Sequence, residues 1–311
     1  MPMNGQERTA YVFPGQGSQW VGMARDIHAA APHARDVFEE ADSALGFRLS
    51  RLCFEGPEDV LRQTVNAQPA ILTVSIAYLR GNELSPASTD IPAFVAGHSL
   101  GEYTALVAAG VLTFKDALLL ARERGRLMQE AGEKHPGGML ALIGLDETAV
   151  RDICDTSGIQ IANINCPGQI AVSGATDPLA RAAELARARG AQRVVPLQVS
   201  GAFHSRLMES AGQGMALATS GLDFRDATIP IVANTTALPI TDGGAVRSEL
   251  LEQLLNCVQW QKSVEYMISH GVTNFIEIGP GQVLTGLIKR INRDVTAISM
   301  EKKDSQKGSA R

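Results

Sequence analysis

A short apolar segment followed by two closely spaced glycines restricts the fold of this chain more than any other feature. Residues 94–97 are predicted to form a buried β-strand, and residues 97–101 read Gly-His-Ser-Leu-Gly. Small residues at 105, 108 and 109 then favour a helix that packs closely behind the strand. In a GxSxG sequence the glycines permit a sharp strand-to-helix turn, which exposes the serine hydroxyl. The segment therefore predicts an α/β fold with Ser99 as a candidate nucleophile.

The rest of the chain supports this fold class. Short apolar runs alternate with amphipathic stretches, as in α/β proteins with a mainly parallel sheet. With 311 residues, 45% of them hydrophobic, the chain can bury a sizeable core. Thr113 and Asp116 resemble a capping box at the start of a long helix. Further strands are predicted at 11–13, 229–233 and 275–278, and helices from Gly22, from His33, over 67–80, over 113–131, from His204, over 250–255 and over 262–270.

The order of elements changes between residues 135 and 199. There the pattern predicts strand, helix, strand, strand, helix and strand, which is a ferredoxin-like unit. We therefore predict a hydrolase-like α/β catalytic subdomain with a parallel sheet, made of residues 1–134 and 200–311. The ferredoxin-like small subdomain, residues 135–199, is inserted into it. The polar residues 301–311 are predicted to form a loose tail.

Composition argues against several classes of protein. The formal net charge is −5, aromatic residues are sparse and basic runs are lacking, so we expect no nucleic-acid partner. The N-terminus lacks a secretory pattern and the apolar segments 69–79 and 105–112 are short, so we expect a cytoplasmic protein without membrane association. The four cysteines and six histidines are scattered without the spacing of metal ligands, so we expect no bound metal.

A serine hydroxyl becomes a good nucleophile only when a base removes its proton, and two histidines compete for this role. His98 adjoins Ser99, so we expect its side chain to leave the turn in another direction and to support it. His204 lies where the chain returns to the larger subdomain and is the better candidate, with an ordinary surface histidine as the alternative. No acid can be assigned to orient the histidine, and a backbone carbonyl could replace it.

Three further residues are candidates for substrate contacts. The amide of Leu100 lies at a predicted helix N-terminus, where it could donate to a developing oxyanion. Gln16, in a glycine-flanked loop, is the best candidate for a second amide, although an ordinary turn is the alternative. Arg124, on the following helix, could bind a carboxylate through two parallel hydrogen bonds, or could lie on a solvated helix face.

Five segments, taken together and in order, resemble the malonyl-CoA:acyl carrier protein transacylases. The resemblance covers almost the whole chain, from about residue 11 to 291, and includes the inserted unit. It implies a transferase that moves a malonyl group from malonyl-CoA to the phosphopantetheine thiol of a holo acyl carrier protein, in fatty-acid or polyketide synthesis. The segments are 13–19 (Phe-Pro-Gly-Gln-Gly-Ser-Gln), 97–103 (Gly-His-Ser-Leu-Gly-Glu-Tyr), 124–125 (Arg-Gly), 202–205 (Ala-Phe-His-Ser) and 277–281 (Glu-Ile-Gly-Pro-Gly).

The resemblance also implies a ping-pong mechanism with named residues. Ser99 would carry the acyl group, and His204 would act as general base and then as general acid. Arg124 would bind the free malonyl carboxylate. Malonyl-CoA would be a substrate, and no bound cofactor is implied.

The resemblance also implies roles for residues around Ser99 and His204. Gln16 and Leu100 would supply the oxyanion amides, and the backbone carbonyl of Gln259 would orient His204. Phe203, directly before the histidine, would favour malonyl over branched acyl groups. Arg206, Lys289 or Arg290 could receive an acidic carrier protein, although such residues are more often simply solvated.

Two departures from the family pattern leave the pathway open. Gly201 stands where malonyl-selective modular enzymes often have histidine, and Cys257 stands where bacterial fatty-acid enzymes often have proline. Two other functions are also possible: a hydrolase of the same fold that acts on acyl carrier proteins, and an inactive docking subunit. Arg124 argues against the first, and the intact Ser99 and His204 argue against the second. The oligomeric state is left open, with a monomer as one option.

Overall fold

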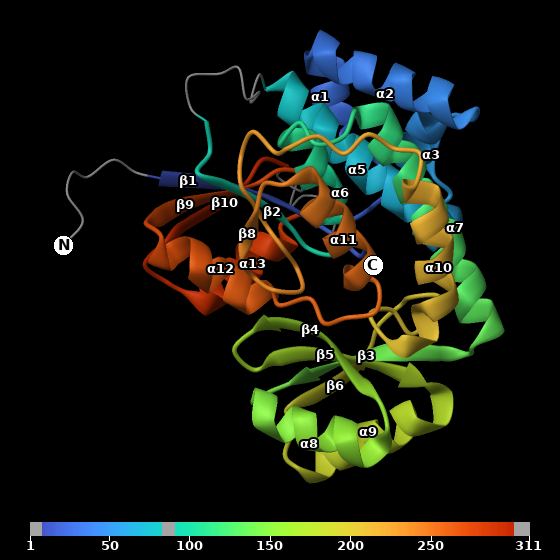
Figure 1. Ribbon diagram of the computed structural model, residues 1–311, viewed down its shortest axis with the longest axis vertical. Coiled ribbons are helices and arrows are strands. Elements are labelled where there is room, and N and C mark those ends of the chain that lie inside the picture. Colours follow the sequence, from blue (N-terminus) through green and yellow to red (C-terminus); the bar gives the residue numbers. More distant parts are fainter. Residues whose placement is uncertain (1–7, 83–90, 302–311) are drawn as a thin grey trace, which may run out of the picture.

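A six-stranded sheet forms the centre of the larger part of the molecule in the computed structural model, which describes residues 8–82 and 91–301 (Figure 1). The strand order is β10-β9-β1-β2-β7-β8, and all neighbours are parallel except β7 and β8. The strands are β1 Arg8–Phe13, β2 Phe94–Gly97, β7 Ile231–Val232, β8 Pro239–Ile240, β9 Val272–Glu277 and β10 Thr296–Ser299. The sequence-based prediction of an α/β class is confirmed.

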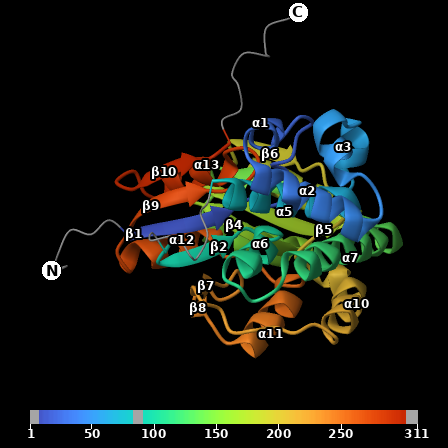
Figure 2. The same cartoon turned by 90° about the horizontal axis from the view of Figure 1, so that it is seen from above.

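Both faces of this sheet are buried, because alternate residues of its central strands face opposite sides. In β1, Tyr11 and Phe13 belong to the main core, whereas Ala10 and Val12 belong to a second core on the other face. Helices α2, α5, α6 and α7 pack together on the main-core side (Figure 2), and α12 and α13 pack against β9. The helices of this part are α1 Arg25–Ala30, α2 Pro32–Leu45, α3 Leu49–Glu55, α4 Glu58–Arg62, α5 Thr64–Gly81, α6 Gly101–Ala108, α7 Phe114–Lys134, α10 Glu209–Thr219, α11 Gly243–Gln253, α12 Trp260–Ser269 and α13 Val283–Ile291, with the 3₁₀ helix η1 Arg206–Met208.

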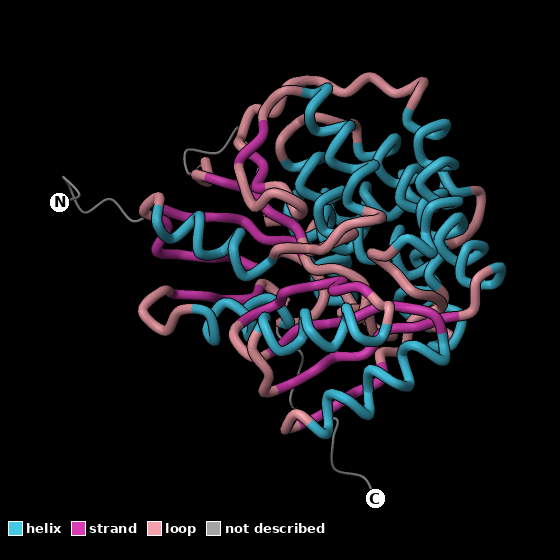
Figure 3. The backbone as a smooth tube through the Cα atoms, turned by 60° about the horizontal axis from the view of Figure 1, so that its bottom comes forward, coloured by secondary structure: helices cyan, strands magenta, loops and turns pink. Residues whose placement is uncertain are grey.

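A second, antiparallel sheet has the strand order β4-β5-β3-β6 and carries α8 and α9 on one face. This is the βαββαβ order of a ferredoxin-like unit, and it lies within residues 137–196. In Figure 3, which brings the lower side of the molecule forward, helices lie in front of these strands. The elements are β3 Gly137–Ile143, α8 Glu147–Ser157, β4 Gln160–Cys166, β5 Gln169–Ala175, α9 Thr176–Ala188 and β6 Arg193–Pro196.

The segment after α11 connects the two parts. Val258 pairs with the edge strand β4: its amide donates to the Ala162 carbonyl at 2.8 Å, and its carbonyl accepts from the Ile164 amide at 2.9 Å. An edge strand exposes backbone amide and carbonyl groups, and the pairing with Val258 gives these groups of β4 hydrogen-bond partners. The larger part therefore supplies a short extension to the sheet of the smaller one.

Several elements differ from the sequence-based predictions. The strand predicted at 229–233 is only two residues long, and β8, β10, α3 and α4 were not predicted, because such short elements lack a clear periodicity. Helix α13 was also missed, although its nine residues have a clear amphipathic pattern. No helix begins at His204; the φ angle of this residue is 55°, and helical turns begin at Arg206. The capping box is confirmed, since Thr113 Oγ1 accepts from the Asp116 amide at 3.1 Å.

The predicted loose tail is wrong at its first residue. Glu301 is buried, and its carboxylate accepts from the amides of Ala24 and Gly281, each at 2.9 Å, and from Trp20 Nε1 at 3.1 Å. The remainder of the predicted tail, residues 302–311, lies outside the described residues. A buried carboxylate with several N–H donors fixes the chain at this point.

Candidate active site

Ser99 lies on a sharp turn between β2 and α6, and its φ angle is 51°, in the left-handed region. The flanking glycines are required by close backbone approach. A Cβ atom on Gly97 would overlap the backbone of Gly101, and a Cβ atom on Gly101 would overlap the carbonyl of Phe13. A nucleophile elbow needs such a strained turn, with a glycine on each side of the serine.

His204 is the histidine that contacts this serine. Its Nε2 atom lies 2.8 Å from Ser99 Oγ, and its Nδ1 atom lies 2.7 Å from the backbone carbonyl of Gln253. A carbonyl oxygen only accepts, so Nδ1 carries the proton and Nε2 is free to accept the serine proton. Burial, and next the positive charge of Arg124, lower the pKa of His204 to about 3. His204 is therefore neutral, as a general base must be.

His98 faces away from this contact, as predicted. Its Nε2 atom lies 2.8 Å from Asn165 Oδ1, on strand β4 of the smaller part, and Asn163 Nδ2 lies 3.3 Å away. Burial lowers the pKa of His98. The residue therefore joins the nucleophile turn to the inserted subdomain.

The prediction for the carbonyl that orients His204 is wrong. The carbonyl belongs to Gln253, the last residue of α11, and not to Gln259. The Gln259 carbonyl accepts from the amide of Ser263 at 2.9 Å, as part of the first turn of α12. The last carbonyls of a helix have no partner within it, so the end of α11 offers a free acceptor and the start of α12 does not.

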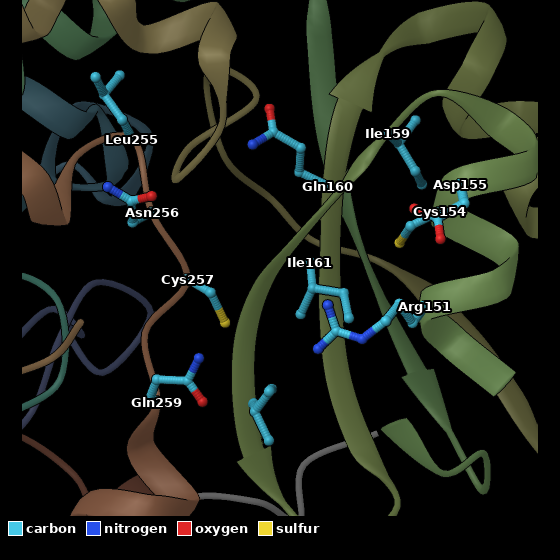
Figure 4. A pocket seen from close by; sticks show the side chains of 11 residues that line it. Arg151, Cys154, Asp155, Ile159, Gln160, Ile161, Leu255, Asn256, Cys257 and Gln259 are labelled. Carbon is cyan, nitrogen blue, oxygen red and sulfur yellow. The ribbon is translucent and has the colours of Figure 1, made fainter. Parts of the chain in front are cut away.

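Figure 4 shows where Gln259 lies instead. Its side chain, with those of Asn256 and Cys257, lines a groove between the segment after α11 and the smaller part. On the other side of this groove lie residues of α8 and β4, among them Arg151 and Gln160. Neither Ser99 nor His204 lines the groove, which is therefore separate from the Ser-His pair.

Arg124 is buried beside the pair, with 1% of its surface exposed, so the alternative of a solvated helix face is wrong. One terminal nitrogen donates to Gln68 Oε1 at 2.8 Å. The other donates to Gln253 Oε1 at 2.9 Å and to Ser99 Oγ at 3.1 Å. The guanidinium also lies over the ring of Tyr103, 5.3 Å from its centroid. Burial lowers the pKa of Arg124.

Among the described residues, no carboxylate lies at ion-pair distance from this buried cation. Every ion pair of the described residues involves other side chains, and the acceptors around Arg124 are neutral glutamine and serine oxygens. Glu102 interacts with Arg124 electrostatically, but the side chain of Gln253 lies between them, and a buried charge without a directly paired counter-charge is costly. The site is thus suited to an anionic group of a ligand next to Ser99.

Gly125 allows Arg124 to reach this position. Helices α5 and α7 pack so closely that a Cβ atom on Gly125 would lie 2.6 Å from the carbonyl of Thr64. This contact places Gln68, one turn along α5, at the guanidinium of Arg124. The glycine of the Arg-Gly pair is therefore a packing requirement that lets Arg124 reach its position.

The loop that contains Gln16 lies next to the turn, because Phe13 of β1 and Gly97 of β2 are paired in parallel register. A Cβ atom on Gly15 would lie 2.5 Å from the His98 carbonyl. Among the described residues, no hydrogen bond takes up the backbone amide of Gln16 or that of Leu100. Their role as oxyanion donors stays a prediction.

The structure gives the positions of Phe203 and of the candidate docking residues. Phe203 is buried in the main core, close to the backbone of Gly201. Arg206, Lys289 and Arg290 are exposed, and Arg290 donates to Gln169 Oε1 at 2.7 Å. The roles proposed for them remain predictions.

Two buried polar residues that sequence reasoning missed complete the site. Asn234 brackets the turn: its Oδ1 accepts from the Ser99 amide at 2.8 Å and its Nδ2 donates to the Gly97 carbonyl at 2.7 Å. Glu102, in the first turn of α6, accepts from the Asn234 amide at 3.0 Å and from the side chain of Gln253. Burial, and next Glu249, raise the pKa of Glu102, whereas these donors and Arg124 oppose the rise.

Sequence signals exist for Asn234 and for Gln253, which sequence reasoning also missed. Asn234 follows strand β7 at the carboxyl end of a parallel sheet, where sites of this fold class gather. Gln253 is a polar residue at the buried positions of α11, in line with Val246 and Leu250. A glutamine at such a position predicts a buried hydrogen-bond network.

Two kinds of feature are absent from the described ranges. Among residues 8–82 and 91–301, no three His, Cys, Asp or Glu side chains lie together as metal ligands do. In the same part of the chain, no helix has the length and apolar character that a membrane span requires.

Comparison with known proteins gives consistent matches along nearly the whole chain. Residues 10–305 match the acyl transferase domain family. The malonyl CoA-acyl carrier protein transacylase of Bacillus subtilis is 45% identical over 298 residues, which cover 94% of this chain and 93% of that protein. The transacylase of the same name from Escherichia coli strain K12 is 43% identical over 295 residues, covering 94% and 95%.

Solved structures agree with these matches. The acyl-carrier-protein-S-malonyltransferase of Bartonella henselae superposes with a TM-score of 0.90 at 43% identity, covering 94% of this chain and 95% of that one. A malonyl-transacylase solved in complex with a type II PKS acyl carrier protein gives a TM-score of 0.92 at 39% identity, covering 96% and 97%.

Proposed function

Since this chain belongs to the acyl transferase domain family, as its motifs predicted, we propose that it transfers a malonyl group from malonyl-CoA to a holo acyl carrier protein. One observation carries the proposal. Ser99 Oγ lies 2.8 Å from a neutral histidine nitrogen and 3.1 Å from a buried guanidinium that forms no direct ion pair among the described residues. The proposed nucleophilic oxygen therefore contacts both its general base and the group that would bind a carboxylate.

The first half-reaction forms an acyl-enzyme. Ser99 Oγ attacks the thioester carbonyl of malonyl-CoA while its proton moves to His204 Nε2. The amides of Leu100 and Gln16 would donate to the oxyanion that develops on the carbonyl oxygen. When the intermediate collapses, the carbon–sulfur bond breaks and His204 returns the proton to the coenzyme A thiolate. Malonyl-Ser99 remains.

The second half-reaction uses the same groups in the opposite direction. The phosphopantetheine thiol of the carrier protein gives its proton to His204, and its sulfur attacks the ester carbonyl of malonyl-Ser99. Collapse breaks the ester bond, and His204 protonates the leaving Ser99 oxygen. The enzyme returns to its starting state, so each cycle exchanges one thioester for another in ping-pong order.

Arg124 would select the acyl group. A single methylene group separates the malonyl carboxylate from the thioester carbonyl. The carboxylate can therefore reach the guanidinium next to Ser99 and form charge-assisted hydrogen bonds. The carboxylate would also pair directly with this buried cation, which Glu102 reaches only through the side chain of Gln253. Phe203, directly before His204, would restrict the space for a branch on the malonyl group.

Three outcomes of one experiment test the proposal. The protein is incubated with an equimolar mixture of malonyl-, methylmalonyl- and acetyl-CoA, its intact mass is measured, and holo acyl carrier protein is then added. We expect a malonyl adduct on the wild type, its loss on transfer to the carrier protein, and no adduct on Ser99→Ala. An adduct that persists in Ser99→Ala would refute the acyl-enzyme, and release of free malonate in place of transfer would indicate a hydrolase.

A further inference from the structure

Glu102 lies three residues after the proposed nucleophile and does not contact the reacting groups. It is 1% exposed, and its two carboxylate oxygens have different partners. Oε1 accepts from the backbone amide of Asn234 at 3.0 Å, and Oε2 accepts from the side-chain nitrogen of Gln253. No step of the proposed mechanism uses this buried acid.

The side-chain amide of Gln253 is held in one orientation. Its nitrogen donates to two oxygen acceptors, Oε2 of Glu102 and the Ser99 carbonyl at 3.0 Å, and the carbonyl can only accept. Its oxygen faces a group that only donates, the Arg124 guanidinium at 2.9 Å. A flipped amide would place two acceptors against its oxygen and a guanidinium against its NH₂ group. The network therefore determines the orientation of the amide.

We propose that Glu102 is a positioning residue for substrate selection. By accepting from the Gln253 amide nitrogen, it turns the amide oxygen toward Arg124 and so holds the guanidinium beside Ser99, where the malonyl carboxylate binds. The inference rests on the proposed function, because it assumes that Arg124 binds this carboxylate. It extends that function by assigning a role to an acid that lies behind the site.

A substitution with the same shape isolates this role. In Glu102→Gln, the oxygen that accepts from the Asn234 amide can remain. The new NH₂ group then faces the NH₂ group of Gln253, so two donors oppose each other. Gln253 must move or flip, and a flip presents its NH₂ group to Arg124. Loss of the acceptor at Glu102 therefore disturbs the Arg124 guanidinium, which lies two hydrogen bonds away through Gln253.

Glu249 provides the matched control. It is also a buried acid near Glu102, but its carboxylate accepts from the amide and the hydroxyl of Thr235, and among the described residues no hydrogen bond joins it to Gln253. Glu249→Gln thus removes the same charge from the same region without changing the partner of the amide. It separates a loss of buried charge from a loss of positioning.

The experiment compares transfer of malonyl and acetyl groups to holo acyl carrier protein by the wild type, Glu102→Gln, Glu249→Gln and Arg124→Ala. For Glu102→Gln we expect kcat/KM for malonyl-CoA to fall about 10- to 100-fold, mainly through KM, and acetyl transfer to change less than about threefold. Glu249→Gln should change the two substrates equally and little. Equal losses for malonyl and acetyl in Glu102→Gln would overturn the inference.

A double-mutant cycle tests whether Glu102 acts through Gln253. Gln253→Leu removes the amide but keeps the backbone carbonyl that binds His204. If the inference holds, adding Glu102→Gln to Gln253→Leu causes no further loss of malonyl transfer, whereas additive losses contradict it. If Glu102→Gln does not fold, Glu102→Asp replaces it; the shorter acid cannot reach Gln253, so the same selective loss is expected.

The Arg124→Ala arm distinguishes this inference from the proposed function. Equal losses of malonyl and acetyl transfer in Arg124→Ala would refute the carboxylate-binding role itself. A selective loss in Arg124→Ala without one in Glu102→Gln would refute only the role of Glu102.

Discussion

Ser99 and His204, whose side chains meet at 2.8 Å, both have positive φ angles, 51° and 55°. For residues other than glycine this conformation costs about 1 to 2 kcal/mol each. Asn234 Oδ1 accepts from the backbone amide of Ser99, and the Gln253 carbonyl accepts from the ring of His204, so hydrogen bonds hold both residues in place. The two residues proposed for catalysis are thus kept in their arrangement at the expense of local backbone stability.

Ser99→Gly should be more stable than Ser99→Ala by about 1 kcal/mol, because glycine adopts a positive φ without strain and alanine does not. Both variants lack the hydroxyl and should form no acyl-enzyme. Urea unfolding of the two variants measures the difference in the free energy of unfolding. Equal stabilities would mean that the turn is not strained at this residue.

His204→Asn should make the free energy of unfolding less sensitive to acid. The folded-state pKa of His204 is lowered to about 3 by burial, so between about pH 3 and 6.5 the unfolded chain binds a proton that the folded chain does not. The stability contribution of the neutral imidazole is therefore complete above pH 6.5 and falls as pH falls. Asparagine does not titrate, and it tolerates a positive φ.

Urea unfolding at pH 7 and pH 5 checks this prediction. The wild type should lose about 2 kcal/mol more than His204→Asn over this interval. His98 titrates in both proteins, so its contribution cancels in the comparison. A difference that does not change with pH would mean that the pKa of His204 is not lowered.

Arg124→Lys should lower kcat/KM for malonyl-CoA at least about tenfold although it keeps the positive charge. The guanidinium reaches Gln68 with one terminal nitrogen and Gln253 with the other, and a single ammonium cannot bind both while it also faces Ser99. Steady-state transfer of malonyl to a carrier protein is the measurement. Activity equal to that of the wild type would show that charge alone is sufficient.

Gly101→Ala should abolish the acyl-enzyme and lower the free energy of unfolding by more than about 2 kcal/mol, because the added methyl group would overlap the carbonyl of Phe13. Gly286→Ala is the control. A Cβ atom there meets nothing within 4 Å, so alanine in helix α13 should stabilise by about 0.5 to 1 kcal/mol. Thermal unfolding and intact mass after exposure to malonyl-CoA report both effects.

The features that sequence reasoning predicted are those specified within a few neighbouring residues. The strand, the two glycines and the helix around Ser99 follow from local spacing, and the six elements of the inserted unit follow from their own periodicity. His204 could be chosen over His98 because adjacent residues on a turn point in different directions. Each of these predictions depends on short-range geometry.

The carbonyl partner of His204 could not be predicted in the same way. Gln253 and Gln259 are both glutamines in the segment between the end of α11 and the start of α12. Which of their backbone carbonyls can accept from His204 depends on where α11 ends. That helix has almost no amphipathic pattern, so its sequence does not mark its last residue. Glu102, Asn234 and Gln253 come from three separate elements, and only the folded chain brings them together.

The pairing of Val258 with β4, together with the bond between His98 and Asn165, has a consequence for protein engineering. The chain runs only five residues from Gln253, which holds His204, to Val258, which extends the small sheet. Deleting residues 137–196 would leave the Val258 backbone and the His98 ring without their partners on both sides of the Ser-His pair. The insert is not a removable module, and chimaeras of related transferases should exchange it together with residues 97–101 and 253–259.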